Sequence, residues 1–339
     1  MLWPETGWCN MRVRCNNQSI MPDSPAQQKI ESGVAGLPEV PLPWRSRYRV
    51  FESVNWIGWI SNQYWFGGVE QQLDDVEQLF SDISVNVWYK QHRNRLAEIK
   101  WPGVADSPEL VVVLKSYGTR TSLDNFRSPF KPSRAIRHWQ NAWELLQRGV
   151  NTPMPIFIAI PKNRRANSFL LAVEPAVPHT RVRTLLHEII RGNAQLDVGD
   201  LAVAPEWLAE CCGRYIRSVH DSGILHRDFS GGNVLIPRDW DGTDTALKSK
   251  FILLDINRIW LVSPQKISIN QRIQDLERLT FPESLLERYF MAYAGDNREI
   301  GNQLPRFLKY RKAYRKLWAT ENPFKRSLLK MFTYWPRTG

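Results

Sequence analysis

The sequence predicts an α+β fold in two lobes: a small lobe built on an antiparallel sheet and a larger, mainly helical lobe. Three observations support this prediction. Apolar residues recur at every second position in segments between residues 83 and 115, which is typical of strands. From Pro205 onward they recur at helical spacing. Two short apolar runs, each flanked by a polar residue, follow that helix and predict a buried hairpin.

In the N-terminal half, an aromatic cluster between Tyr48 and Phe66 predicts a packed cap on the small lobe, with a substrate-stacking platform as the alternative. Residues 71–81 have the spacing of a short connecting helix. Residues 83–89 and 96–101 predict two strands joined by a turn, and residues 109–115 predict a third strand. This order of elements is typical of a small antiparallel sheet.

The middle of the chain predicts one helix and two further strands before the large lobe begins. Ser133 is placed to cap a helix over residues 135–148, which Gly149 ends. Residues 157–160 and 168–174 predict the two strands. The helix that starts at Pro205 carries an apolar stripe and should support the loop that follows it. The stripe consists of Trp207, Leu208, Cys211, Cys212, Tyr215, Ile216 and Val219.

The loop after this helix holds the residues with the clearest chemistry. It runs His226-Arg227-Asp228-Phe229-Ser230-Gly231-Gly232-Asn233, and the apolar runs 234–236 and 251–254 follow, the second closed by Asp255. Paired as a hairpin, these runs would place Asn233 and Asp255 side by side. Asp228 can accept a hydroxyl proton, while Asn233 and Asp255 can supply oxygen ligands to Mg²⁺ on nucleotide phosphates. The pattern therefore predicts phosphoryl transfer.

This pattern resembles the catalytic and metal-binding loops of the protein-kinase-like fold, where His-Arg-Asp-x-x-x-x-Asn is followed by Asp-Phe-Gly. Here Asp255-Ile256-Asn257 replaces Asp-Phe-Gly. Together with the run from Ser133 to Pro153, it is similar to the bacterial lipopolysaccharide kinase family, the Kdo and core-heptose kinases. The resemblance covers about residues 80–280. It implies ATP- and Mg²⁺-dependent phosphorylation of a sugar hydroxyl on a lipopolysaccharide-core or related glycolipid acceptor, at the inner face of the bacterial cytoplasmic membrane.

The resemblance also implies roles for five residues. Asp228 is the catalytic residue that orients the acceptor hydroxyl, and Asn233 and Asp255 hold Mg²⁺ beside the nucleotide. Lys115, late in the third strand, reaches the α- and β-phosphates; the alternative is a solvated lysine at a strand end. Glu174 ends the last small-lobe strand at the hinge, where backbone groups after it could bond the adenine edge.

Two departures from the family pattern keep a non-catalytic alternative open. The turn at residues 91–95 has no glycine to close over phosphates, so Arg93 and Arg95 become candidates to contact phosphate through their side chains. His138 stands where many members have a glutamate that pairs with the strand lysine, and Glu144 lies on another helix face. One rival is therefore a pseudokinase that binds a partner without turnover. The other is a kinase for protein or another small molecule.

In the catalytic loop itself, we expect His226 to organise the backbone by hydrogen bonding. We interpret Arg227 as structural, or as a contact for a phosphate on the acceptor.

Composition and charge indicate which compartment and which kinds of partner to expect. No apolar stretch approaches the roughly 20 residues that a spanning helix needs, and the first residues resemble no targeting signal, so we expect a cytoplasmic protein. The four cysteines form neither a disulfide framework nor a zinc signature. The net charge of +11 predicts an anionic partner, either a phosphorylated acceptor, an anionic membrane surface or, less favoured, nucleic acid.

We assign residues 1–45 to a flexible N-terminal tail, 46–175 to the kinase small lobe with its cap, 176–303 to the large lobe and 304–339 to a basic amphipathic segment. The last segment holds ten Lys or Arg against one acid, Glu321. Its aromatic residues share one helical face, so it either packs on the large lobe or lies on an anionic membrane surface.

Overall fold

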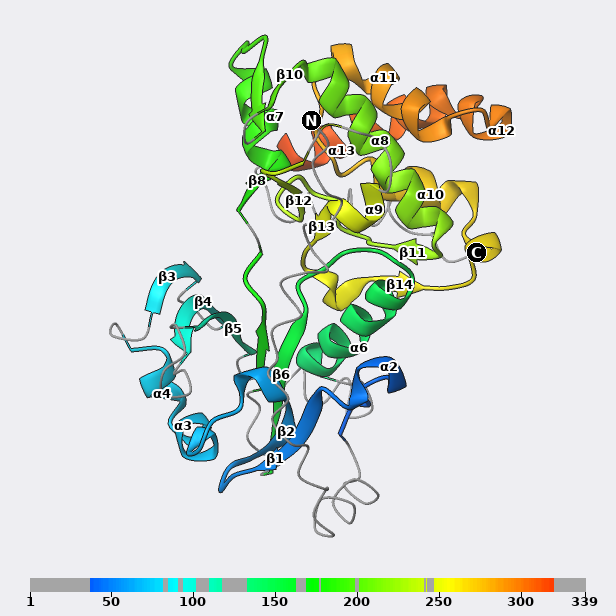
Figure 1. Cartoon of the computed structure of the whole chain (residues 1–339). Coiled ribbons are helices and arrows are strands. Elements are labelled where there is room, and N and C mark those ends of the chain that lie inside the picture. Colours follow the sequence, from blue (N-terminus) through cyan, green and yellow to red (C-terminus); the bar gives the residue numbers. More distant parts are fainter. Residues whose placement is uncertain are drawn as a thin grey trace, which may run out of the picture. The chain divides into compact units, whose positions relative to one another are not determined.

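The computed structural model describes residues 37–81, 85–90, 94–101, 110–117, 133–162, 169–176, 178–198, 201–240, 242 and 247–319 (Figure 1). Three predicted features therefore fall outside the described residues, in whole or in large part. They are the N-terminal tail as far as residue 36, the turn at residues 91–93 and the basic end beyond residue 319.

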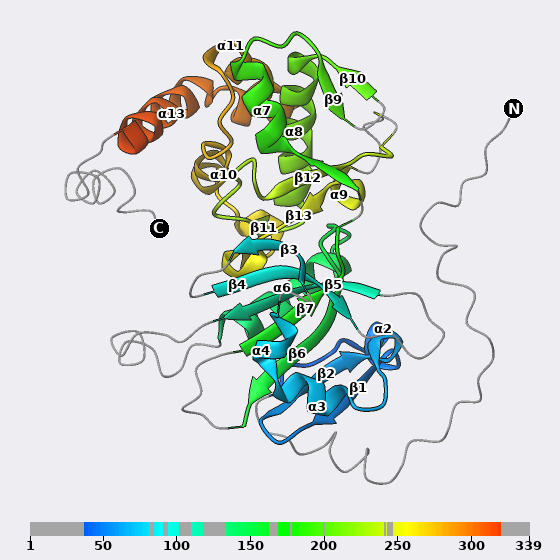
Figure 2. The same ribbon diagram turned by 90° about the vertical axis from the view of Figure 1, so that its left-hand side faces the viewer.

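An antiparallel sheet of seven strands is the main feature of the first half of the described chain, and its order is β1-β2-β6-β7-β5-β4-β3 (Figure 2). The strands are β1 Tyr48–Glu52, β2 Trp56–Ser61, β3 Val85–Lys90, β4 Asn94–Trp101, β5 Leu110–Tyr117, β6 Pro155–Pro161 and β7 Phe169–Val173. The predicted strands of this half are thus present. The mixed fold with an antiparallel sheet is confirmed.

The aromatic cluster packs as expected, but it does so as part of the sheet rather than as a separate cap. β1 and β2 pair with each other, and β2 also pairs with β6. Phe51, Trp56 and Trp59 are buried. Residues 38–45, which we placed in the tail, contain the short helix α2 Leu42–Arg45, and Trp139 Nε1 donates to the Glu39 carbonyl at 3.2 Å.

The connecting helix expected at residues 71–81 is two helices, α3 Val69–Asp74 and α4 Val76–Leu79. Asp75 separates them because its side chain accepts a hydrogen bond from the Gln78 amide and so starts a new helix.

Both faces of the sheet are covered by hydrophobic side chains. Successive residues of a strand point to opposite faces, so Phe157 packs in one cluster and Ile158 in another. On the Ile158 side lies α6 Arg134–Gln147, which buries Trp139 and Trp143 against Tyr48. Ser133 caps this helix as predicted, accepting from the Ile136 amide at 3.1 Å.

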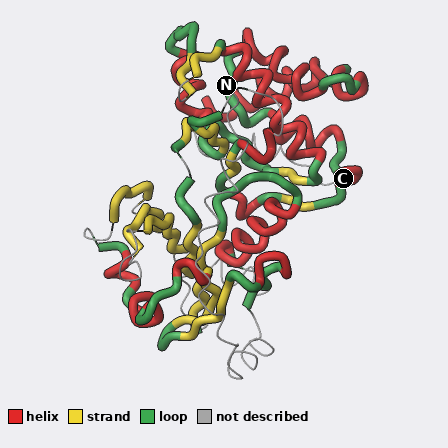
Figure 3. Tube along the Cα trace, viewed as in Figure 1, coloured by secondary structure: helices red, strands yellow, loops and turns green. Residues whose placement is uncertain are grey.

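The second half is mainly helical. In Figure 3 its helices are concentrated in one part of the Cα trace, and the strands of the seven-stranded sheet in another. Its helices are α7 Val182–Ile190, α8 Pro205–Asp221, α9 Leu247–Lys250, α10 Ile269–Leu276, α11 Glu283–Ala294, α12 Arg298–Gly301 and α13 Leu304–Ala319. Short strands lie between them: β8 His179–Arg181, β9 Leu196–Val198, β10 Leu201–Val203, β11 Ile224–Leu225, β12 Val234–Pro237, β13 Ile252–Leu253 and β14 Trp260–Leu261.

α8 is the central helix of this half. It starts at Pro205 as predicted, and its apolar stripe is buried apart from the partly buried Trp207, with Cys211 and Cys212 both in the core. Gly213 lets α8 approach α11 closely, because a Cβ at Gly213 would lie 2.4 Å from the carbonyl oxygen of Tyr289. One large hydrophobic core surrounds the two helices.

α13 packs on this core through its first half, which is one of the two expected arrangements. Phe307 is fully buried, and the nearly buried Arg311 donates to the Glu277 carbonyl at 2.8 Å. Four other cations on the helix are exposed: Lys309, Lys312, Arg315 and Lys316. Among the described residues, no helix combines the length and the apolar character needed to cross a bilayer.

Candidate active site

The predicted hairpin is present as the antiparallel pair β12–β13. Val234 lies opposite Leu253, and the Leu254 amide donates to the Asn233 carbonyl at 2.9 Å. The connection between the strands contains α9, so it is longer than a simple turn. The pairing brings the residues that flank the two strands, Asn233 and Asp255, to the same end of the hairpin.

The loop before β12 is tied down by His226 and by an acid that sequence reasoning missed. His226 is buried, and its Nε2 lies 2.8 Å from the Leu254 carbonyl oxygen, as its predicted organising role requires. Asp275, at the end of α10, accepts from the amides of His226 and Arg227, both at 2.7 Å. An acid between Ile273 and Leu276 on the apolar face of a helix is the sequence signal that could have identified Asp275.

Asp228 lies in this loop with one carboxylate oxygen in an ion pair. Its Oδ1 is 3.2 Å from Nη1 of Arg278, and its backbone carbonyl accepts from Asn233 Nδ2 at 2.9 Å. The second contact fixes the amide of Asn233. Because the nitrogen of that amide is committed to the loop, its Oδ1 is the atom available to a ligand.

The two glycines before Asn233 leave room for a neighbouring helix. A Cβ at Gly232 would lie 2.7 Å from Nη2 of Arg183, and one at Gly231 would lie 2.9 Å from the Arg183 backbone nitrogen. That nitrogen also donates to the Gly231 carbonyl at 2.8 Å. The glycines therefore allow the start of α7 to pack directly on the catalytic loop.

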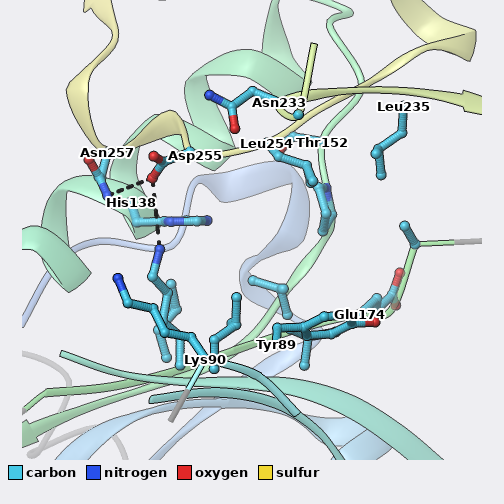
Figure 4. A pocket seen from close by; sticks show the side chains of 18 of the residues that line it. Tyr89, Lys90, His138, Thr152, Glu174, Asn233, Leu235, Leu254, Asp255 and Asn257 are labelled. Atoms are coloured by element: carbon cyan, nitrogen blue, oxygen red, sulfur yellow. Dashed lines mark hydrogen bonds and ion pairs between the residues drawn. The ribbon is translucent and has the colours of Figure 1, made fainter. Parts of the chain in front are cut away.

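Lys115 finds its carboxylate partner in Asp255 rather than on α6. Its Nζ lies 3.9 Å from Asp255 Oδ1, and the same oxygen accepts from Asn257 Nδ2 at 3.0 Å (Figure 4). Burial lowers the pKa of Lys115, while the charge of Asp255 acts in the opposite direction. Asp255, the residue expected to bind Mg²⁺, is therefore also the acid that faces Lys115.

His138, which the resemblance placed where many family members have a glutamate, is buried. Its Nδ1 lies 3.1 Å from the Tyr117 hydroxyl. Burial, and then the charge of Lys115, hold the pKa of His138 well below its ordinary value, so the ring is neutral. Glu144 pairs with Arg148 at 3.4 Å on another face, as expected.

A cavity of about 520 Å³ joins most of the predicted site residues. Its lining includes Lys115, Glu174, Asn233 and Asp255, whereas Asp228 is not part of it. Figure 4 shows Asn233 and Asp255 on one side of the cavity and Glu174 on the other. The volume is in the range of small-molecule sites, about 300–1,000 Å³.

Two further predicted contacts concern groups around this cavity. The Glu174 amide donates to the Met154 carbonyl at 2.8 Å, so a nucleotide edge would have to use other backbone groups of this segment, such as those that follow Glu174. Arg95 also lines the cavity, and its guanidinium donates twice to Glu77, at 2.9 and 3.0 Å, and stacks on Phe80. The phosphate contact suggested for Arg95 therefore stays a prediction, and Arg93 lies outside the described residues.

The side-chain oxygen atoms of Asn233 and Asp255 suit a Mg²⁺ ion that binds together with a nucleotide. Asn233 offers an amide oxygen, and Asp255 keeps Oδ2 beside the oxygen that faces Lys115. Mg²⁺ in such sites takes one or two protein oxygens and completes its octahedron with phosphates and water. In the part of the chain that the structure describes, no cluster of three or more His, Cys, Asp or Glu could hold a metal without such help.

Comparisons with known proteins show which family this chain matches. The model of the family described as "Lipopolysaccharide kinase (Kdo/WaaP) family" matches residues 112–293, more than half of the chain. No curated protein matches. A solved structure, "WaaP in complex with acyl carrier protein", is 15% identical over 70% of this chain and 91% of that chain, with a TM-score of 0.47. The matched region spans Asp228, Asn233 and Asp255, and the chain belongs to the lipopolysaccharide kinase (Kdo/WaaP) family and is an ATP-dependent kinase.

Proposed function

We propose that this kinase transfers the γ-phosphate of ATP to a sugar hydroxyl of a lipopolysaccharide-core or related glycolipid acceptor. The observation that supports this most directly is the shared cavity of Lys115, Asn233 and Asp255, which borders the loop of Asp228. In this proposal the sheet and the helical half are the two lobes of a protein-kinase-like fold, and the nucleotide lies in the cavity.

The residues would act mainly by positioning and by neutralising charge. Asp228 would orient the acceptor hydroxyl and accept its proton as the new phosphate ester forms. Lys115 would hold the α- and β-phosphates, since its ammonium lies in the cavity beside Asp255. Mg²⁺, held by Asn233 and Asp255, would neutralise the charge that develops on the transferred group.

The pseudokinase alternative drew on α6, which offers no acid to Lys115 and carries the buried, neutral His138 in its place. The contact between Lys115 and Asp255 argues against it, since it supplies an alternative partner for the lysine. A kinase for protein or another small molecule differs from our proposal only in the acceptor. Both rival functions are compatible with the same cavity, so an assay of phosphate transfer is needed to separate them from our proposal.

We also propose that the enzyme works in the cytoplasm on the inner face of the membrane that carries its acceptor. The exposed cations of α13, Lys309, Lys312, Arg315 and Lys316, support this, because they offer a positive surface to anionic headgroups.

The test is transfer of radiolabelled phosphate from ATP to purified lipopolysaccharide, free sugars and proteins. We expect labelling of the lipopolysaccharide core only. Asp228→Ala should lower turnover on the order of a thousandfold, because proton acceptance and hydroxyl orientation reside on one side chain. Asp197→Ala, which removes an exposed acid on β9, is the matched control and should keep the wild-type rate. Labelling of protein instead would mean that the acceptor is a protein. ATP binding without any transfer would favour the pseudokinase.

A further inference from the structure

Arg278 lies directly against the carboxylate that is expected to receive the acceptor hydroxyl. Its Nη1 is 3.2 Å from Asp228 Oδ1, and the side chains are 29% and 37% exposed, respectively. The contact thus lies at the surface of the site, open to an incoming molecule. Neither partner is locked in the core.

The backbone around Arg278 is held firmly, so the side chain always starts from the same place beside the site. Asp275 binds the catalytic loop through two amides, Arg311 donates to the Glu277 carbonyl at 2.8 Å, and Leu279 is buried. These contacts lie on both sides of Arg278. They present its side chain to Asp228 whether or not the ion pair itself is strong.

The ion pair uses little of what a guanidinium can bind. Arg278 has five N–H donors, and within the described residues its only hydrogen bond is the one to Asp228. The pair also occupies Oδ1, one of the two oxygens that the acceptor hydroxyl could use. A ligand that drew Arg278 away would therefore gain a strong donor pair and free the carboxylate at the same time.

We propose that Arg278 binds an anionic group of the acceptor, a carboxylate or a phosphate close to the hydroxyl that is phosphorylated, and exchanges Asp228 for that group when the acceptor binds. The inference rests on the proposed function and adds the charge of the substrate. Arginine suits this role because its planar guanidinium can donate two parallel hydrogen bonds to either anion. Two further cations lie at the same loop: Arg227 is exposed, and Arg183 lies over Gly232.

The experiment compares three forms of one lipopolysaccharide core oligosaccharide: untreated, with its carboxylates reduced to alcohols, and with its phosphates removed. Affinity is measured by calorimetry, and KM and kcat are measured with ATP. Arg278→Gln removes the guanidinium, and Arg278→Lys keeps the charge without the planar fork. Arg288→Gln is the matched control, because it breaks another surface arginine pair, with Glu210 on α8, and removes the same charge.

For the wild type we expect one treated form to bind at least tenfold more weakly than the untreated form, and the form that does so identifies the anion. Arg278→Gln should bind the untreated and treated forms equally weakly, with a larger change in KM than in kcat, and Arg278→Lys should recover part of the difference. Arg288→Gln should behave as the wild type. All variants should melt at the same temperature.

Two results would overturn the inference: a wild type that binds all three forms alike or binds none, or an Arg278→Gln variant that still distinguishes them. A wild type that distinguishes the forms by calorimetry but transfers no phosphate would contradict the proposed function while supporting Arg278 as the anion contact.

Discussion

Asp255 is the side chain at which the contacts of the site meet. It is paired with Lys115, accepts from Asn257, and has a left-handed backbone with φ of 53°. For a residue other than glycine this conformation is strained by about 1–3 kcal/mol. Such strain persists only when the surrounding contacts hold it, and at Asp255 these contacts also aim the carboxylate into the cavity.

Replacing Asp255 by Asn tests whether this carboxylate holds the metal. We expect Asp255→Asn to weaken Mg²⁺-dependent ATP binding by about tenfold or more, because a neutral amide is a poorer ligand for a hard cation. Binding of metal-free ATP should change much less, since the substitution also removes a negative charge that repels the phosphates. Calorimetry with Mg²⁺ and with a chelator measures both. Equal losses under the two conditions would show that Asp255 is only structural.

His138 makes the stability of the protein depend on pH. Its pKa is depressed in the folded state from an ordinary value of 6.5, so the unfolded chain binds more protons as pH falls below that value. The free energy of unfolding should therefore decrease from pH 6.5 downward, by up to about 1.4 kcal/mol per pH unit from this residue. At higher pH the contribution is constant.

The variant that isolates this effect is His138→Gln, which keeps a polar partner for Tyr117 and cannot be protonated. Urea unfolding at pH 7.5, 6.5 and 5.5 should give a shallower decrease for the variant than for the wild type. The pKa of the buried His220 is also lowered, but His220 is present in both proteins and its contribution cancels. Parallel decreases would mean that another group is responsible.

At the scale of elements, α10 positions the loop of residues 226–233 although α10 contributes nothing to the cavity lining. Ser268 and Gln271 form a capping box at its start, and its last turn carries the buried Asp275. Because the capping box fixes the residue at which α10 begins, it also fixes where the last turn with Asp275 lies. The two amides of the catalytic loop then bind to an acid that α10 and the core hold in place.

The packing of α8 on α11 depends on Gly213. Alanine normally stabilises a helix relative to glycine, by up to about 1 kcal/mol. At Gly213 we expect the opposite: Gly213→Ala should destabilise the protein, because its Cβ would lie 2.4 Å from the Tyr289 carbonyl oxygen and 2.9 Å from the Tyr293 nitrogen. Backbone atoms cannot move aside cheaply, so α8 and α11 would have to separate.

Gly301→Ala is the matched control, since Gly301 also lies in a helix and the nearest atom to its Cβ would be 3.9 Å away. It should be neutral or slightly stabilising. Thermal melting of both variants measures the difference. A Gly213→Ala protein as stable as the control would show that the interface between the helices adapts.

At the scale of the whole molecule, the net charge of +11 should direct the protein to anionic surfaces. We expect co-sedimentation with anionic but not neutral vesicles, falling steeply with salt, because each cation near such a surface contributes roughly 1 kcal/mol and is screened. Changing the exposed cations of α13 to Gln should weaken this binding. These residues are Lys309, Lys312, Arg315 and Lys316.

The control for this measurement is a variant in which four exposed cations away from α13 are changed to Gln for the same loss of charge: Arg191, Lys250, Lys266 and Arg288. Vesicle binding that falls equally in both variants would mean that net charge rather than α13 is responsible. Binding to neutral vesicles as strong as to anionic ones would remove the electrostatic explanation altogether.

Short-range patterns in the sequence were sufficient for the parts of this protein that are local in the chain. Alternation predicted β3, short apolar segments predicted β4 and β5, the Ser133 cap predicted the start of α6, and the stripe after Pro205 predicted α8. The spacing from His226 to Asn233 and the apolar runs around it identified the loop, the hairpin and the kinase family. Each depends on residues only a few positions apart, whose types limit the backbone directly.

The tertiary structure alone decided which distant side chains meet. It paired Lys115 with Asp255 and Arg95 with Glu77, and it placed Arg278 on Asp228 and Asp275 under the loop of residues 226–233. It also made strands of the aromatic segment we expected to be a cap. The physical reason is that burial and charge pairing depend on which surfaces the folded chain brings together. Residue spacing within one segment carries no information about its partner in another.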